Sequence, residues 1–132
     1  MCIAEVISEG LPLSSIGVFV HPELPKEHVV ISLQFGSRNI FLEALEDDSL
    51  RVSSAINSKD YVELKSGCNS PLSHVIGQPL RWAWEMINNN GYLDGIQMEF
   101  AKSVASDANI IQLQVMASRM DYRLVTPIKI TK

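Results

Sequence analysis

Along much of this chain apolar side chains recur at every second residue, which is the spacing of a β-strand with one buried face. Three segments of this kind follow one another closely, at residues 29–35, 40–45 and 50–53, and a polar turn separates each from the next. Strands joined by such short turns pair in antiparallel fashion. The pattern therefore predicts a three-strand meander in the first half of the chain.

Several other segments are also predicted as strands. They are Ile3–Ser8, Ile16–Val20, Ile110–Met116 and Tyr122–Ile130, whereas residues 53–67 are expected to form a loop with one short element around Tyr61–Leu64. The segment His21–Pro25 holds two prolines, each of which removes a main-chain donor, so a loop or a sheet edge is predicted there. Pro127 places the final strand toward a sheet edge for the same reason.

One short helix is predicted at Ser70–Ile76, because Ser70 can cap its first turn, Pro71 suits its first position and Gly77 stops it. With 132 residues and no linker or repeat, the chain is expected to form a single domain over residues 1–132. We therefore expect a mainly β fold of antiparallel hairpins and a meander, with about seven to nine strands and one or two short helices. The alternative class is α+β.

The strongest single pattern runs from Leu80 to Phe100. Large apolar residues alternate with other residues on both sides of a polar loop, as Leu80, Trp82, Trp84 and Met86 before it and Ile96, Met98 and Phe100 after it. If Met86 lies opposite Ile96, all of them share one face of a hairpin and Glu85 and Glu99 share the other. This register places Trp82 and Trp84 in the core, and Asn88 opposite Asp94 at the mouth of the loop.

The run W-x-W-E-M-I-N-N-N-G-Y-L-D-G-I-Q-M-E-F, from Trp82 to Phe100, resembles a segment of a family of small uncharacterised bacterial proteins. In that family, aromatic strand residues precede an Asn/Gln-Gly-Tyr-x-Asp turn and an Ile/Leu-Gln strand. The resemblance covers about a seventh of the chain. It implies a bacterial origin and a shared fold, and it transfers no catalytic residue.

Charge and hydropathy exclude several classes of partner. The net charge is −4, and the basic residues are scattered, so binding to a nucleic-acid backbone is not expected. No apolar window reaches the length of a spanning helix, and residues 1–6 do not resemble a secretory signal, so we expect no membrane association and a cytoplasmic location. In that compartment Cys2 and Cys68 are expected to be reduced.

Motifs that carry chemistry are missing from the sequence. His21, His28 and His74 are far apart, and no metal-binding spacing of histidine or cysteine occurs. Gly-rich phosphate loops and the G-x-S-x-G elbow are also missing. The sequence therefore offers no catalytic residue, no metal site and no cofactor site, and it favours a non-enzymatic role.

The loop of the hairpin supplies the candidate binding residues, which are Asn88, Asn89, Asn90, Tyr92 and Asp94. The competing interpretation is a structural turn whose side chains bind its own main chain. Trp82 and Trp84 form an alternative binding candidate as an aromatic platform, in competition with their place in the core.

Three functions remain open. The leading hypothesis is a protein-binding module of bacterial origin, in the manner of an immunity protein, that engages a partner through this loop or an acidic face. The residues of that face are Glu43, Glu46, Asp47 and Asp48. The first alternative is a small-ligand-binding or enzymatic domain with an aromatic pocket of Trp82, Trp84, Tyr92 and Phe100. The second is a structural subunit of a homo-oligomer.

Overall fold

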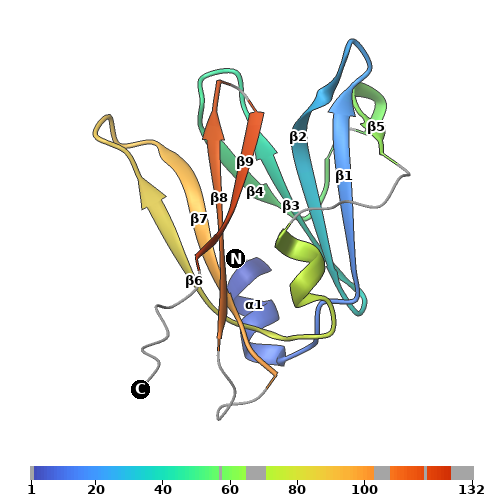
Figure 1. Ribbon diagram of the computed structural model, residues 1–132, viewed down its shortest axis with the longest axis vertical. Coiled ribbons are helices and arrows are strands. Elements are labelled where there is room, and N and C mark those ends of the chain that lie inside the picture. The colour runs from blue at the N-terminus through green and yellow to red at the C-terminus, as the bar shows by residue number, and fades with distance from the viewer. Residues whose placement is uncertain (1, 57, 65–70, 103–107, 118, 126–132) are drawn as a thin grey trace, which may run out of the picture.

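The computed structural model describes residues 2–56, 58–64, 71–102, 108–117 and 119–125. Within them the chain forms nine strands in two antiparallel sheets, one α-helix and two 3-10 helices (Figure 1). The predicted mainly β fold is confirmed. Cys68, Ser70, Pro127 and the predicted final strand beyond Val125 lie outside the described residues.

The first sheet contains the predicted meander. Its strands are β1 (Ser15–His21), β2 (Leu24–Phe35), β3 (Arg38–Ala44), β4 (Leu50–Ser53) and β5 (Val62–Glu63). They lie in the order β4-β3-β2-β1-β5, so only the pairing of β1 with β5 joins strands that are distant along the chain.

The second sheet is a meander of four strands in chain order. They are β6 (Leu80–Ile87), β7 (Leu93–Phe100), β8 (Asn109–Met116) and β9 (Arg119–Val125). Strand β8 shows the half-buried alternation predicted for it, because Ile111, Leu113 and Val115 are buried while Gln112 and Gln114 are partly exposed.

The two sheets share one hydrophobic core. Phe35 of β2 and Phe100 of β7 are fully buried, and their rings stack with centroids 6.5 Å apart and planes 5° apart. Strand β2 also packs against β9. There His28 Nδ1 and Tyr122 Oη are hydrogen-bonded at 2.8 Å, and burial lowers the pKa of His28.

The N-terminal segment predicted as a strand is instead helix α1 (Cys2–Glu9), which lies between the two sheets at one end of the molecule (Figure 1). The strand prediction was wrong because Ile3, Val6 and Ile7 also have helical spacing, and a short apolar run fits both periods. Ile3 and Val6 are buried in the core. Gly10, with φ of 65°, ends the helix and donates its N–H to the carbonyl of Val6 at 3.2 Å.

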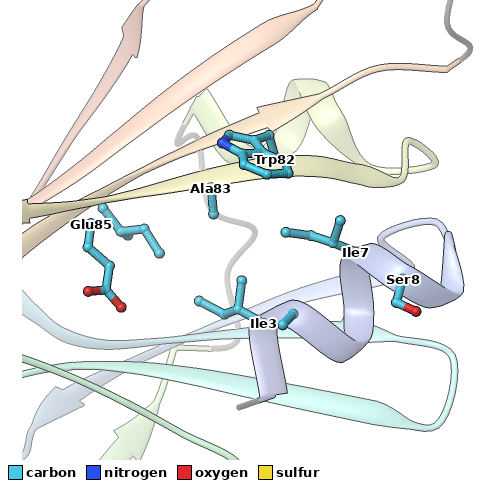
Figure 2. Close-up of a pocket in the computed structure, with 8 residues that line it drawn as sticks. Ile3, Ile7, Ser8, Trp82, Ala83 and Glu85 are labelled. Carbon is cyan, nitrogen blue, oxygen red and sulfur yellow. The ribbon is translucent and has the colours of Figure 1, made fainter.

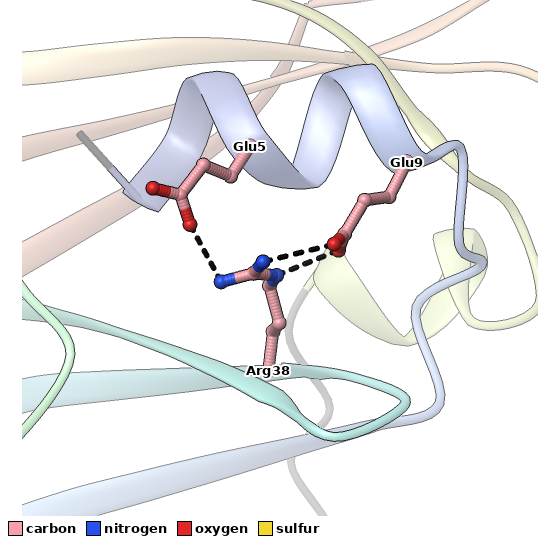
Figure 3. A network of polar contacts seen from close by, with 3 residues as sticks. All are labelled: Glu5, Glu9 and Arg38. Atoms are coloured by element: carbon pink, nitrogen blue, oxygen red, sulfur yellow. Dashed lines mark hydrogen bonds and ion pairs between the residues drawn. The ribbon is translucent and has the colours of Figure 1, made fainter.

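The polar side of α1 is held by Arg38, at the start of β3 (Figure 3). Its guanidinium donates to Glu9 at 2.6 and 2.9 Å and to Glu5 at 2.5 Å. Because all of these side chains are at least one-third exposed, the ion pairs orient the helix, while burial of its apolar side supplies most of the stability.

The proline-rich segment between β1 and β2 is shorter than the predicted loop. Only Pro22 and Glu23 form the turn, and β2 already begins at Leu24. Pro25 lies in the part of β2 that, among the described residues, pairs with β1 alone, as the sheet-edge alternative predicted, and the pairing is irregular here: Val20 lies opposite His28, while His21 lies opposite Leu24. These register shifts let the strand continue through Pro25, which has no N–H to donate.

The predicted short helix is present as the 3-10 helix Pro71–Val75, which buries Leu72 and Val75 in the core. A second 3-10 helix, Ser58–Asp60, precedes β5. Among the described residues no helix is long and apolar enough to cross a membrane.

Candidate functional site

The hairpin of β6 and β7 forms as predicted, but its register differs by one residue. Glu85, rather than Met86, lies opposite Ile96, and Trp84 lies opposite Gln97. The pairing shifts between Leu80 and Trp82 and again between Met86 and Ile87. These irregularities turn Leu80 inward while the following tryptophans point outward, and strict alternation of the sequence could not reveal them.

Gly95 of β7 allows close packing between β7 and its neighbours in the observed register. A Cβ on Gly95 would lie 2.8 Å from the main-chain oxygen of Leu113 and 3.2 Å from the sulfur of Met86. Met86 pairs with Gly95 on the outer face of the sheet, so its side chain occupies the space that any other residue at position 95 would fill.

The prediction that Trp82 and Trp84 belong to the core was wrong, because both point away from the opposite sheet. Their exposed fractions are 54% and 42%, whereas Ile96 and Met98 on the inner face of β7 are buried. On the outer face Trp84 lies opposite Gln97, which donates from Nε2 to Gln112 Oε1 on β8 at 2.8 Å. The two indoles therefore form an exposed aromatic surface on β6.

The loop between β6 and β7 is a tight turn organised by Asn88. Its Oδ1 accepts from the main-chain N–H of Asn90 at 2.9 Å and of Tyr92 at 3.1 Å. Its main-chain N–H donates to the carbonyl of Tyr92 at 2.9 Å, and Gly91 adopts φ of 82°. Asn88 does not lie opposite Asp94 as predicted, because Ile87 pairs with Leu93 and closes the strand. Asn88 thus has a structural role in shaping the loop.

Large apolar side chains are exposed at the end of the sheet that carries this turn. We call this surface the hairpin tip and define it as Ile87, Asn89, Asn90, Tyr92 and Met116. Ile87, Tyr92 and Met116 are each more than half exposed, and Asn89 and Asn90 are exposed beside them. Because Asn88 fixes the turn, the tip presents these side chains on a well-defined main chain.

Three of the four residues predicted to form an acidic face are exposed. Glu46, Asp47 and Asp48 are exposed on the turn between β3 and β4, which lies at the same end of the molecule as the turns after β6 and β8 (Figure 1). Glu43 is only 5% exposed and binds other side chains, so it does not contribute to an acidic face.

Glu43 is the centre of a polar cluster on β3. Its Oε1 accepts from Arg51 at 2.6 and 3.0 Å, and its Oε2 accepts from the hydroxyl of Tyr61. Burial, together with the hydrogen bond to Glu43, raises the pKa of the Tyr61 hydroxyl well above its ordinary value. The ring of His21 contacts that of Tyr61, with centroids 5.2 Å apart. The cluster ties the segment that follows β4 to the outer face of the first sheet.

A cavity of about 350 Å³ lies between α1 and β6 (Figure 2). Ile3 and Ile7 on the helix face Ala83 on the strand, and Glu85 lies at one end. The remaining lining residues are Ala4, Ser8, Trp82 and Ile96. Apart from Glu85 and Ser8, the walls are apolar.

This cavity is not the aromatic pocket that the sequence predicted. Phe100 is fully buried in the core, Trp84 is on the outer face of the sheet, and Tyr92 is at the hairpin tip. Of the four predicted residues, only Trp82 lines the cavity. The sequence could not reveal the site, because one of its walls is the helix that had been predicted as a strand.

Within the part of the chain that the structure describes, no three histidine, cysteine or acidic side chains gather in a way that could hold a metal ion. Arg81 and Glu99 form an ion pair across the hairpin at 2.8 Å. Glu85 was predicted to share the face of Glu99, but it lies on the inner side of β6 beside the cavity.

Comparison with protein-family models found one that matches residues 5–129. The chain belongs to DUF6334, a family of unknown function. The match extends across both sheets, so family membership concerns the whole fold rather than the hairpin alone. Comparisons with curated proteins and with solved structures found no match.

Proposed function

We propose that this protein is a non-enzymatic protein-binding module of bacterial origin that engages its partner through the hairpin tip. The observation that carries the proposal is the exposure of Ile87 at 57% and Tyr92 at 51% on a turn fixed by Asn88. Exposed aromatic and apolar side chains on a pre-organised main chain are typical of residues that anchor protein interfaces.

The charge near the tip favours a basic partner. Glu46, Asp47 and Asp48 are exposed at the same end of the molecule, and the net charge of the chain is −4. A negatively charged surface accelerates association with a positively charged protein. A cytoplasmic immunity protein that neutralises a basic toxin would use a surface of this kind, with Asp94 bordering it.

Replacing Tyr92 with alanine is expected to weaken partner binding by more than about tenfold while leaving the melting temperature nearly unchanged, because the side chain is exposed. The partner is first recovered with the tagged chain from host lysate and identified. Its affinity for the purified variants is then measured by calorimetry. Asp94→Ala serves as a second variant at the edge of the tip.

Ile76→Ser is the matched control, since Ile76 is 48% exposed and precedes β6 at the end remote from the tip. The proposal requires this variant to bind like the wild type. A partner that binds Tyr92→Ala and Asp94→Ala with wild-type affinity would rule out the tip as the recognition surface.

A small apolar ligand in the α1–β6 cavity is the second candidate function, and the cavity itself favours it. Its volume of about 350 Å³ reaches the range of small-molecule sites, which are mostly apolar with few polar groups. An aliphatic alcohol fits this chemistry, because its chain can contact Ile3 and Ile7 while its hydroxyl binds Glu85.

Titration with 1-octanol is expected to show saturable binding that Ala4→Leu abolishes, because Ala4 lines the cavity and the larger side chain narrows it. Ala55→Leu is the control, since Ala55 is also exposed but does not line the cavity. Absence of saturable binding to the wild type, or equal binding to both variants, would contradict a ligand site here.

A further inference from the structure

The α1–β6 cavity has a single carboxylate at one end of an otherwise mostly apolar lining. Glu85 lies at that end, and Ile3 and Ile7 face Ala83 beside it (Figure 2). Among the residues that line the cavity, Glu85 alone is charged. Apolar walls with one fixed negative charge suit a ligand that has an apolar part and a cationic part.

No basic side chain balances this charge within the part of the chain that the structure describes. Glu85 forms no hydrogen bond or ion pair there. Helix α1, which forms the opposite wall, carries Glu5 and Glu9 but no lysine or arginine, and both of its carboxylates bind Arg38. A carboxylate without a counter-charge beside an apolar surface attracts a cation.

The position of Glu85 suits a charged group that stays in contact with water. Glu85 is exposed, whereas Ile3 and Ile96 in the cavity wall are buried. An ammonium group at Glu85 can therefore keep part of its hydration while an alkyl chain enters the cavity, as a lysine side chain buries its methylene groups and leaves its charge in solvent. The large cost of burying an isolated charge is thereby avoided.

We propose that the ligand of this cavity is a primary alkylamine, whose chain lies against Ile3, Ile7 and Ala83 and whose ammonium group binds the Glu85 carboxylate. Such binding depends on the small-ligand function proposed above and specifies its head group. An aliphatic alcohol of equal length makes the same apolar contacts, but it offers one O–H donor and no charge. An ammonium group offers three N–H donors and a charge opposite to that of Glu85.

Basic side chains line a neighbouring cavity instead of this one. The neighbouring cavity, of about 220 Å³, shares Ile7 with the first and is also lined by Arg81 and Lys102. Arg81 already donates to Glu99 at 2.8 Å. A fatty acid would place its carboxylate near these basic residues rather than beside Glu85, because like charges repel. An alkylamine and a fatty acid of equal length are therefore expected to differ in affinity for the α1–β6 cavity.

Calorimetric titration of the purified chain with octylamine, 1-octanol and octanoate tests the head group at neutral pH, where the amine is protonated as a lysine side chain is. We expect octylamine to bind about fivefold or more tightly than 1-octanol, and more tightly than octanoate. Ala4→Leu should abolish the binding of octylamine and of 1-octanol. Octylamine that binds no more tightly than 1-octanol or octanoate would overturn the alkylamine proposal and leave the ligand site in place. If none of the three compounds binds, the ligand site itself is refuted.

Glu85→Gln identifies the source of the preference for the amine. The substitution removes the charge and keeps the size of the side chain, so the affinity for octylamine should fall to about that for 1-octanol, whose own affinity should hardly change. Glu63→Gln is the matched control, because it makes the same charge change at an exposed residue of β5 in the other sheet and should retain the preference. Circular dichroism confirms that both variants are folded. A preference that survives Glu85→Gln, or that both variants lose equally, would refute the role of Glu85.

Discussion

Replacing Phe100 with alanine is expected to lower the free energy of unfolding by about 3–5 kcal/mol, the largest effect of any single change considered for this protein. Phe100 is fully buried and stacks on Phe35 of the other sheet. The truncation removes apolar contact area and leaves a cavity at the junction of both sheets. Equilibrium unfolding in urea, followed by circular dichroism, measures the change.

Trp84→Ala is the comparison variant, because it removes an aromatic side chain from the outer face of the sheet. The sequence pattern placed Trp84 in the core, where truncation of an aromatic side chain costs about 3–5 kcal/mol, but its side chain is 42% exposed. We therefore expect a loss within about 1 kcal/mol. If Trp84→Ala proved as destabilising as Phe100→Ala, the outward orientation of the tryptophan would be wrong.

Removal of the Glu43 side chain is expected to have the second largest effect. Glu43→Ala should cost about 1–3 kcal/mol, because the partly buried Tyr61 hydroxyl loses its acceptor. The loss of Arg51 as a partner adds less, since the Arg51 side chain is 57% exposed. Urea unfolding at neutral pH gives the change in stability.

A second measurement on the same variant identifies the cause. Burial raises the pKa of Tyr61 first, and Glu43 raises it further. Glu43→Ala removes only the second cause, so the pKa of Tyr61 should fall while remaining above its ordinary value. Ultraviolet titration of the phenol, assigned with Tyr61→Phe, follows it. Glu46→Ala is the control, because Glu46 is exposed on the next turn. If the pKa of Tyr61 were the same in the wild type, Glu43→Ala and Glu46→Ala, the cluster would be refuted.

The meanders could be predicted from sequence because their information is local. Turn residues at 36–39 and 46–49 separate alternating segments, and β2, β3 and β4 pair as expected. The β6–β7 register could not be predicted, since it depends on irregularities at both ends of the hairpin. Alternation shows that Trp82 and Trp84 share a face, but it cannot show which face the other sheet covers.

The candidate site was predictable only in part. The Asn-Gly chemistry correctly indicated a tight turn, and the structural interpretation of Asn88 follows from its hydrogen bonds. A binding role for Asn89, Asn90, Tyr92 and Asp94 stays a prediction. The α1–β6 cavity was missed because it arises where α1 meets a strand about eighty residues later in the chain, and the sequence carries no local signal for that contact.

The order of strands in the two sheets also bears on how the chain folds. Among the described residues, every strand pairing except β1 with β5 joins neighbours in the chain, so these ladders can close through short loops at small entropic cost. Contacts that require distant residues to meet include those of Phe35 with Phe100, of β2 with β9 and of α1 with β6. Each meander can therefore assemble early and separately, and the slow step becomes the docking of two preformed halves.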